Sequence, residues 1–207
     1  DPAWTLRDGS SLASSGAGLL KVVREGSFIG VIGEREVDVD RALEQLARDC
    51  RWEERDSLPD EQALADWLRA GPHEEIEVVA EPGADEHNDS TLTASYTKPF
   101  LVHGSIAPSV GLARWDDDTV HVWSHSQGIH ALRNAIAAAL GLDSTQVVIE
   151  HVENAGCYGH NAADDAAFDA VLLARAAPGR PVQARWTRAD ELTWGPLSSA
   201  MTATISA

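Results

Sequence analysis

The chain has 207 residues, of which 43% are hydrophobic, and a formal net charge of −17. This length suffices for one large core or two smaller ones. The negative charge argues against binding to a nucleic-acid backbone, which requires basic surfaces. The lack of any run of about 18 apolar residues argues against direct membrane insertion. The first residues show no basic-then-apolar signal segment, which leaves the cytoplasm and the periplasm both open as the compartment.

The first part of the chain has the patterns of short strands and helices. Residues 1–18 are unpatterned and are expected to form a loose terminus. Residues 19–31 are typical of two strands joined by a turn. Apolar residues recur at helical spacing over 39–50 and again, more briefly, over 64–70. Residues 76–80 (IEVVA) predict a short strand.

Residues 81–90 (EPGADEHNDS) are polar and contain Gly and Pro, which makes them the best candidate for a domain boundary. After them, residues 91–96 alternate like a strand. Residues 110–124 are typical of a hairpin with an Asp-rich turn. A clear helical pattern over 129–140 is closed by Gly141.

The remaining pattern continues with a strand over 146–152, a Gly-containing turn, a helix over 164–177 and a strand over 181–187. No element is predicted for residues 192–207. The order of strands, helix, strand, helix and strand favours the α+β class, with mixed β-sheets covered by helices.

The Gly-containing turn, ENAGCYGHNAADD, spans residues 153–165. Gly156 and Gly159 would let the backbone turn sharply and approach a ligand closely. The first N–H groups of the following helix lack internal partners and, with the helix dipole, favour an anion such as phosphate. The motif is neither the dinucleotide fingerprint nor a Walker loop, and an ordinary strand-to-helix connection has the same pattern.

Several polar residues lie just before or within the 129–140 helix. The amide of Gln127 would serve equally well as a ligand contact or as a helix cap. Arg133, one turn into the helix, would either reach an anion or lie in solvent. Ser126 lies beside His125, but no nucleophile elbow accompanies it, so a hydrolase has little support.

His121, His125 and His130 are spaced four and five residues apart. Two histidines on one strand face are suitable zinc ligands, although a third ligand is not evident. The two cysteines, Cys50 and Cys157, are too few for a disulfide framework and form no C-x-x-C pair. No metal ligands are therefore assigned to this chain.

Taken in order, several motifs resemble the large subunit of the molybdenum hydroxylases, the xanthine dehydrogenase and aldehyde oxidase family. They are KPFLVHGSIAPSVGLARW, SQG, VVIEHV, AGCYGHNAADDAAFDAVLLARA and GRPVQARWTRADE. Isoquinoline oxidoreductase and nicotinate dehydrogenase large subunits of bacteria are the most similar branch. The segment GSFIGVIGEREVDVDRALEQLA resembles the end of an α/β hammerhead domain. The resemblance implies a hammerhead-like domain over 1–88 and the first part of a molybdopterin-binding domain over 89–207.

In that family the backbone of a Gly-Gly-Phe-Gly type loop lies against a molybdenum–pterin cofactor. The resemblance implies that the cofactor is the cytosine dinucleotide form. The implied cofactor-binding residues are Gln127, Gly156, Cys157, Tyr158 and Gly159. His103 matches a histidine common in the preceding strand. Leu101 stands where the xanthine-type enzymes have a Gln, and Ala107 where many relatives have a Glu. Because these two side chains bear on substrate recognition, the resemblance does not identify the substrate of this chain.

The resemblance implies an oxidoreductase that hydroxylates N-heterocycles or oxidises aldehydes, with water as the oxygen source. Electrons would leave through an iron–sulfur small subunit toward a cytochrome or a flavin. The general-base Glu of the family is expected outside these 207 residues, so the chain alone is expected to be inactive and to bind no cofactor tightly. The alternative is a non-catalytic binding or assembly module in which the Gly turn is a plain connection.

Overall fold

The computed structural model describes residues 4–6, 18–53, 55–78, 92–154, 156–159 and 165–206. The chain forms two compact units, each built from two stretches of sequence. The first unit contains Asp1–Arg55 and His103–Pro196, and the second contains Asp56–Val102 and Leu197–Ala207. The expected boundary segment at 81–90 and most of the expected loose terminus lie outside the described residues. The division into 1–88 and 89–207 stays a prediction.

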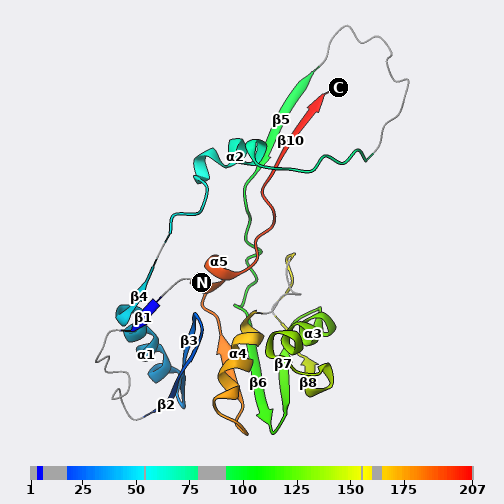
Figure 1. Ribbon diagram of the computed structural model, residues 1–207. Coiled ribbons are helices and arrows are strands. Elements are labelled where there is room, and N and C mark those ends of the chain that lie inside the picture. The colour runs from blue at the N-terminus through cyan, green and yellow to red at the C-terminus, as the bar shows by residue number, and fades with distance from the viewer. Residues whose placement is uncertain are drawn as a thin grey trace. The chain divides into compact units, whose positions relative to one another are not determined.

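The largest sheet belongs to the first unit and has four strands in the order β8-β7-β6-β9 (Figure 1). They are β6 Val110–Asp116, β7 Thr119–Ser124, β8 Val147–His151 and β9 Val182–Arg185. β7 and β8 run parallel, whereas β6 is antiparallel to both of its neighbours. Buried and half-buried residues alternate along β6 and β7, because successive side chains point to opposite faces. The predicted mixed sheet and its hairpin are confirmed.

Two helices cover the buried face of this sheet. α3 Ile129–Leu140 packs against β8, and α4 Asp165–Arg175 packs mainly against β6 and β9. α3 ends as predicted at Gly141, which has a φ of 67° and donates its N–H to the carbonyl oxygens at the helix end. The short 3-10 helix η3 Ser144–Gln146 then leads into β8. The α+β class predicted from the order of elements is confirmed.

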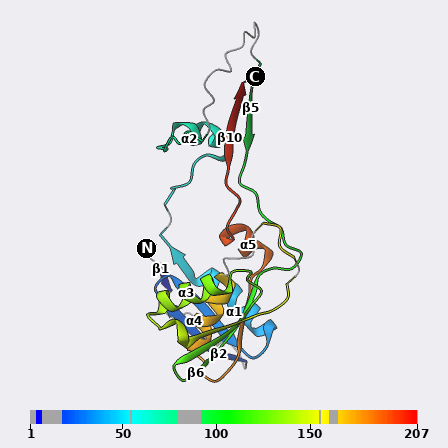
Figure 2. The same ribbon diagram turned by 90° about the vertical axis from the view of Figure 1, so that its right-hand side faces the viewer.

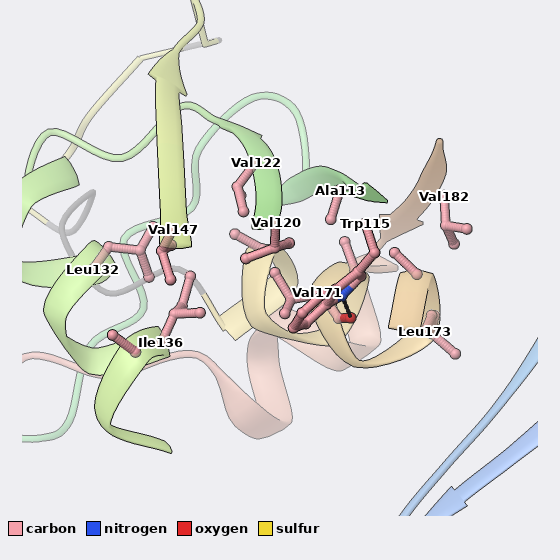
Figure 3. Close-up of a cluster of buried hydrophobic side chains, with 14 of the residues drawn as sticks. Ala113, Trp115, Val120, Val122, Leu132, Ile136, Val147, Val171, Leu173 and Val182 are labelled. Carbon is pink, nitrogen blue, oxygen red and sulfur yellow. Dashed lines mark hydrogen bonds between the residues drawn. The ribbon is translucent and has the colours of Figure 1, made fainter. Parts of the chain in front are cut away.

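The main core lies between the sheet and these helices (Figure 3). Val120, Val122, Ile136 and Val171 are each at most 1% exposed. Trp115 lies in the same cluster, and its Nε1 donates a hydrogen bond to the carbonyl oxygen of Val171 at 3.0 Å. This bond satisfies the only polar atom of a large buried ring, so the ring is buried without an unpaired donor.

α4 is enclosed on two sides, and seven of its 11 residues are buried, which is typical of an interior helix. On one side it meets the hairpin of β2 Leu19–Glu25 and β3 Phe28–Gly33. A Cβ at Gly30 would lie 2.6 Å from Cδ2 of Leu173. On the sheet side, a Cβ at Gly111 would lie 2.4 Å from the Cα of Ala167. Small residues therefore set the close approach of α4 to both neighbours.

The N-terminal stretch of the first unit confirms the predicted strands and helix of residues 19–50. α1 Glu36–Asp49 follows β3 and continues directly into β4 Cys50–Trp52, which pairs with β1 Trp4–Leu6. A second, smaller core holds α1 on β3. Its buried residues are Val31, Ala42, Leu46 and Cys50.

The second unit is built around a two-stranded antiparallel ribbon, which Figure 2 shows from the side. Its elements are η2 Glu61–Ala63, α2 Leu64–Ala70, β5 Thr93–Lys98 and β10 Met201–Ser206. Hydroxyl groups meet across the ribbon, with 3.0 Å between Thr93 and Ser206 and 3.1 Å between Ser95 and Thr204. The predicted short helix and the strand after residue 90 are confirmed. No helix in the described residues is long and apolar enough to cross a membrane.

Three predictions about secondary structure need correction. Residues 76–78 are irregular rather than a strand, and residues 79 and 80 lie outside the described ranges. The strand predicted over 181–187 is limited to β9, because a helix begins just after it. No element was predicted after residue 187, but this part of the chain contains α5 Arg188–Trp194 as well as β10. β10 was missed although Met201, Ala203 and Ile205 alternate with hydroxyl residues as in a strand. Its partner β5 is about 100 residues away in sequence, so no hairpin pattern marks the pairing.

We predict that Gly111→Ala lowers the free energy of unfolding by about 1–3 kcal/mol, because the new methyl group would overlap the backbone of α4. Denaturant unfolding would measure this difference. Gly71→Ala is the control, since its Cβ would lie 3.4 Å from the nearest atom, in ordinary contact. Equal stability of the two variants would contradict the packing described for Gly111.

Candidate functional site

The polar connections of the first unit gather at one end of the four-stranded sheet. β7 and β8 are parallel, so they end at the same edge, with Ser124 opposite His151. The N–H of Val152 donates to the carbonyl oxygen of Ser124 at 3.0 Å, which extends this pairing by one residue. The connection of residues 125–128 and the Gly turn therefore leave the sheet side by side. The carboxyl ends of parallel strands are the usual place for ligand sites in open sheets.

The two antiparallel strands bring two more segments to this end. Residues 103–109 lead into β6, and Trp186 follows β9. The N–H of Trp186 donates to the carbonyl oxygen of Ser109 at 3.0 Å, and the N–H of Val110 donates to Nε2 of His125 at 3.4 Å. In Figure 1, α5 lies at this end and the β6–β7 turn lies at the other. Four segments that are distant in sequence thus surround one edge of the sheet.

The Gly turn has a backbone that requires its glycines. Gly156 has a φ of 107° and Gly159 a φ of 117°, a region that side-chain-bearing residues rarely adopt. The side chain of Asn154 accepts a hydrogen bond from the N–H of Gly156 at 3.0 Å. The ring of Tyr158 folds back over Gly156, where a Cβ would lie 2.8 Å from its Cε2. The interpretation of the two glycines as a sharp turn is confirmed within the described residues, which exclude 155 and 160–164.

His103 covers the other glycine of the turn. A Cβ at Gly159 would lie 2.9 Å from Cδ2 and 3.3 Å from Nε2 of His103. The loop before β6 and the turn after β8 are therefore in direct contact. Tyr158 remains 56% exposed and Cys157 is also exposed, so the turn presents a face to solvent.

This face offers hydrogen-bond donors to a ligand. Among the described residues, the backbone N–H groups of 157–159 have no acceptor. The Nε of Arg133 in α3 is buried and has no hydrogen-bond partner among the described residues, so this atom is not exposed on the face of the turn. Backbone N–H groups are donors that anions and polar rings recruit.

Gln127 lies in the neighbouring connection and is exposed. Its amide makes no hydrogen bond to any described residue, and the N-cap of α3 is Gly128. Instead, the buried hydroxyl of Ser126 accepts a hydrogen bond from the N–H of Gly128 at 3.0 Å. No side chain caps α3 through a hydrogen bond, so the capping role weighed for Gln127 is not realised and its amide is available to a ligand.

The structure does not support a nucleophile at Ser126 or a zinc site at His121 and His125. The hydroxyl of Ser126 is buried and bonded within its own turn, so it is not exposed as a nucleophile. His121 stacks on Trp123 on the outer face of the sheet, whereas His125 lies beyond the end of β7. In the part of the chain that the structure describes, no group of three or more His, Cys, Asp or Glu side chains is placed to hold a metal ion.

The sequence reasoning missed the polar residues that α5 contributes to this end. Glu191 accepts hydrogen bonds from both the N–H and the hydroxyl of Ser109. The pattern of Thr187 followed three residues later by Asp190 is a capping box, and both of its hydrogen bonds are formed. That signal would have located the start of α5.

A partly buried carboxylate supports the same region from α4. Oδ2 of Asp169 accepts a hydrogen bond from Nε1 of Trp186 at 2.8 Å. Burial raises the pKa of Asp169 above its ordinary range, the Trp186 hydrogen bond lowers it, and the charges of Asp165 and Asp190 raise it further. The raised pKa means that ionised Asp169 destabilises the fold relative to its protonated form.

Comparison with known proteins identifies the family of this chain. Residues 76–207 match the family model described as a molybdopterin cofactor-binding domain. Over 197 residues, the chain is 37% identical to one of the subunits of nicotinate dehydrogenase from Pseudomonas putida. That match covers 93% of this chain but only 16% of the relative, so the chain spans a small part of the relative's length.

Solved structures with the same fold include two oxidoreductases. Aldehyde oxidoreductase from Desulfovibrio desulfuricans matches 99% of this chain and 28% of its own, with a TM-score of 0.69 and 19% identity. CO dehydrogenase from Oligotropha carboxidovorans matches 97% of this chain and 31% of its own, with a TM-score of 0.68 and 14% identity. At sequence identities this low, the structural similarity shows a shared fold and nothing more specific.

We predict that Asp169→Asn stabilises the protein increasingly as the pH rises above about 4, the ordinary pKa of an aspartate, toward the raised folded-state pKa of Asp169. The folded-state pKa of Asp169 lies above its unfolded value, so the cost of ionising it in the fold is absent below the unfolded pKa, grows as the pH rises to the folded pKa and is constant above it. Urea unfolding of both proteins at several pH values would measure the difference. A difference independent of pH would contradict this assignment.

Proposed function

Because the chain belongs to the family of molybdopterin cofactor-binding domains, we propose that the backbone of residues 156–159 lies against a molybdenum–pterin cofactor. The proposed cofactor-binding residues are Gln127, Gly156, Cys157, Tyr158 and Gly159. The observation that carries this proposal is the turn itself, where two glycines with positive φ follow β8 at the edge where β7 also ends.

The residues present fit such a group. Any side chain at Gly156 or Gly159 would collide with Tyr158 or His103, so the turn keeps a bare backbone toward its exposed face. The N–H groups of 157–159 suit the phosphate and the polar ring edges of a pterin dinucleotide, which we propose is the cytosine form.

The protein residues would act by binding and orientation. When bound, the cofactor supplies the two-electron redox chemistry of the metal centre. The amide of Gln127 would donate or accept a hydrogen bond on the cofactor side of the 125–128 connection. The exposed ring of Tyr158 would line the approach of an apolar substrate. We place the general-base Glu outside these 207 residues and assign that role to none of them.

For the whole protein we propose an oxidoreductase that hydroxylates N-heterocycles or oxidises aldehydes with oxygen from water. The 37% identity to a chain of nicotinate dehydrogenase supports a heteroaromatic substrate. That relative is named as a subunit, which supports an assembly with other chains. We propose an iron–sulfur small subunit as the electron acceptor, followed by a cytochrome or a flavin. In this protein, residues 1–88 would end a hammerhead-like domain and 89–207 would begin the cofactor domain.

The deciding experiment is the molybdenum and nucleotide content of the complete gene product, expressed with its neighbouring small subunit. The proposal expects about one molybdenum per chain and a cytidine nucleotide released from the pterin. A well-folded complex that lacks molybdenum would overturn it and favour a non-catalytic binding module.

We predict that Gly159→Val abolishes cofactor occupancy in the complete complex while the protein still folds. The side chain would strain a backbone with a φ of 117° and displace His103. Molybdenum content and thermal unfolding would be measured together. Gly179→Val is the matched control, since Gly179 also has a positive φ but bonds to Trp115, toward the opposite end of the sheet. Normal molybdenum content in Gly159→Val would contradict the proposal.

We also predict that Tyr158→Ala lowers kcat more than it lowers cofactor content. The exposed ring of Tyr158 would line the substrate side, whereas its backbone, which the substitution keeps, would contact the cofactor. Tyr158→Phe keeps the ring over Gly156 and should retain most of the turnover. Steady-state kinetics normalised to molybdenum content would test both variants. An unchanged kcat in Tyr158→Ala would refute the assignment.

A further inference from the structure

The loop of residues 103–109, which precedes β6, is held by polar contacts. None of its residues is buried, and Ile106 is 78% exposed. Apolar burial therefore contributes little to its position. Because an exposed loop without fixed contacts would sample many conformations, its hydrogen bonds decide where it lies.

Glu191 of α5 provides the first of these contacts. Its Oε1 accepts hydrogen bonds from the N–H of Ser109 at 2.6 Å and from the hydroxyl of Ser109 at 2.9 Å. Its Oε2 accepts a hydrogen bond from Nη1 of Arg188 at 2.6 Å. The Glu191 side chain is only 12% exposed, so these charged contacts are shielded from water more than an ordinary surface pair.

Arg188 extends the same network along the loop. Its Nη2 donates to the carbonyl oxygens of Ser105 and of Ile106, the latter at 3.1 Å. The cap of α5 is already provided by Thr187 and Asp190, so Glu191 and Arg188 are not needed for that purpose. Their hydrogen bonds instead fix three points of the 103–109 loop.

The other end of the loop carries His103, whose ring lies against Gly159. We propose that Glu191 and Arg188 are positioning residues, which fix the 103–109 loop and thereby hold His103 against the Gly turn. The backbone of 156–159 then keeps the conformation that meets the ligand. This inference rests on the proposed function for the identity of that ligand, whereas the coupling between α5 and the turn is measurable without it.

The test compares amide hydrogen exchange in the complete gene product and its small subunit, with molybdenum content measured on the same samples. Glu191→Ala removes the acceptor of both Ser109 bonds and the partner of Arg188. Since hydrogen bonds to charged groups are strong, exchange at 103–109 should become about tenfold faster. Within the turn, the N–H of Gly156 is bonded to the side chain of Asn154, so it is the amide that can report a change there. The proposal further requires faster exchange at Gly156 and a several-fold loss of molybdenum.

Two variants control this comparison. Glu34→Ala also removes a carboxylate paired with an arginine, Arg180, but in a pair that is 51% exposed on both sides. It should change neither the exchange at Gly156 nor the molybdenum content. Glu191→Gln keeps an acceptor oxygen for Ser109 and should lie between the parent and Glu191→Ala. If Glu191→Ala does not fold, Glu191→Gln carries the same comparison.

The outcomes separate this inference from the proposed function. Faster exchange at 103–109 with unchanged exchange at Gly156 would overturn the positioning role, even if molybdenum is present. Faster exchange at both 103–109 and Gly156 would establish the coupling, even if the parent complex holds no molybdenum and the proposed function fails.

Discussion

The packing of α4 against β6 is the contact on which the candidate site depends. Gly111 and Ala167 allow the helix to approach the strand so closely that a single added methyl group would meet its backbone. α4 follows the Gly turn in the chain, and β6 follows the loop that carries His103. The same close contact therefore fixes the ends of both segments that meet at Gly159. Because interior packing tolerates little displacement, the two segments keep a constant separation.

The arginines of this acidic chain join segments that are distant in sequence. Arg175, Arg180 and Arg185 pair with Glu25, Glu34 and Glu36 of the N-terminal stretch. These pairs are about half exposed, so each contributes little to stability in water. Among them, only the pair of Arg175 and Glu25 joins the β2–β3 hairpin to α4, and apolar burial supplies most of the energy of that contact. The pair of Arg188 and Glu191 differs because Glu191 is largely buried.

Local patterns were sufficient to predict the elements whose partners are near in sequence. The β6–β7 hairpin has an Asp-rich turn, and α3 ends at a left-handed glycine, so neighbouring residues alone specify both. The glycines of the turn were also recognisable, because few other residues tolerate their φ values. The contacts of His103 with Gly159 and of Glu191 with Ser109 join residues more than fifty positions apart. Only the strand order of the sheet brings such pairs together, and no local pattern encodes it.

The way in which the 103–109 loop is held has a consequence for substrate choice under the proposed function. Its hydrogen bonds involve the carbonyl oxygens of Ser105 and Ile106 and the N–H and hydroxyl of Ser109. The exposed Ala107 contributes none of them, and the family resemblance implies a Glu at this position in many relatives. A side chain at 107 can therefore vary without releasing the loop. Backbone contacts would keep the cofactor face constant while residue 107 adapts the site to different substrates.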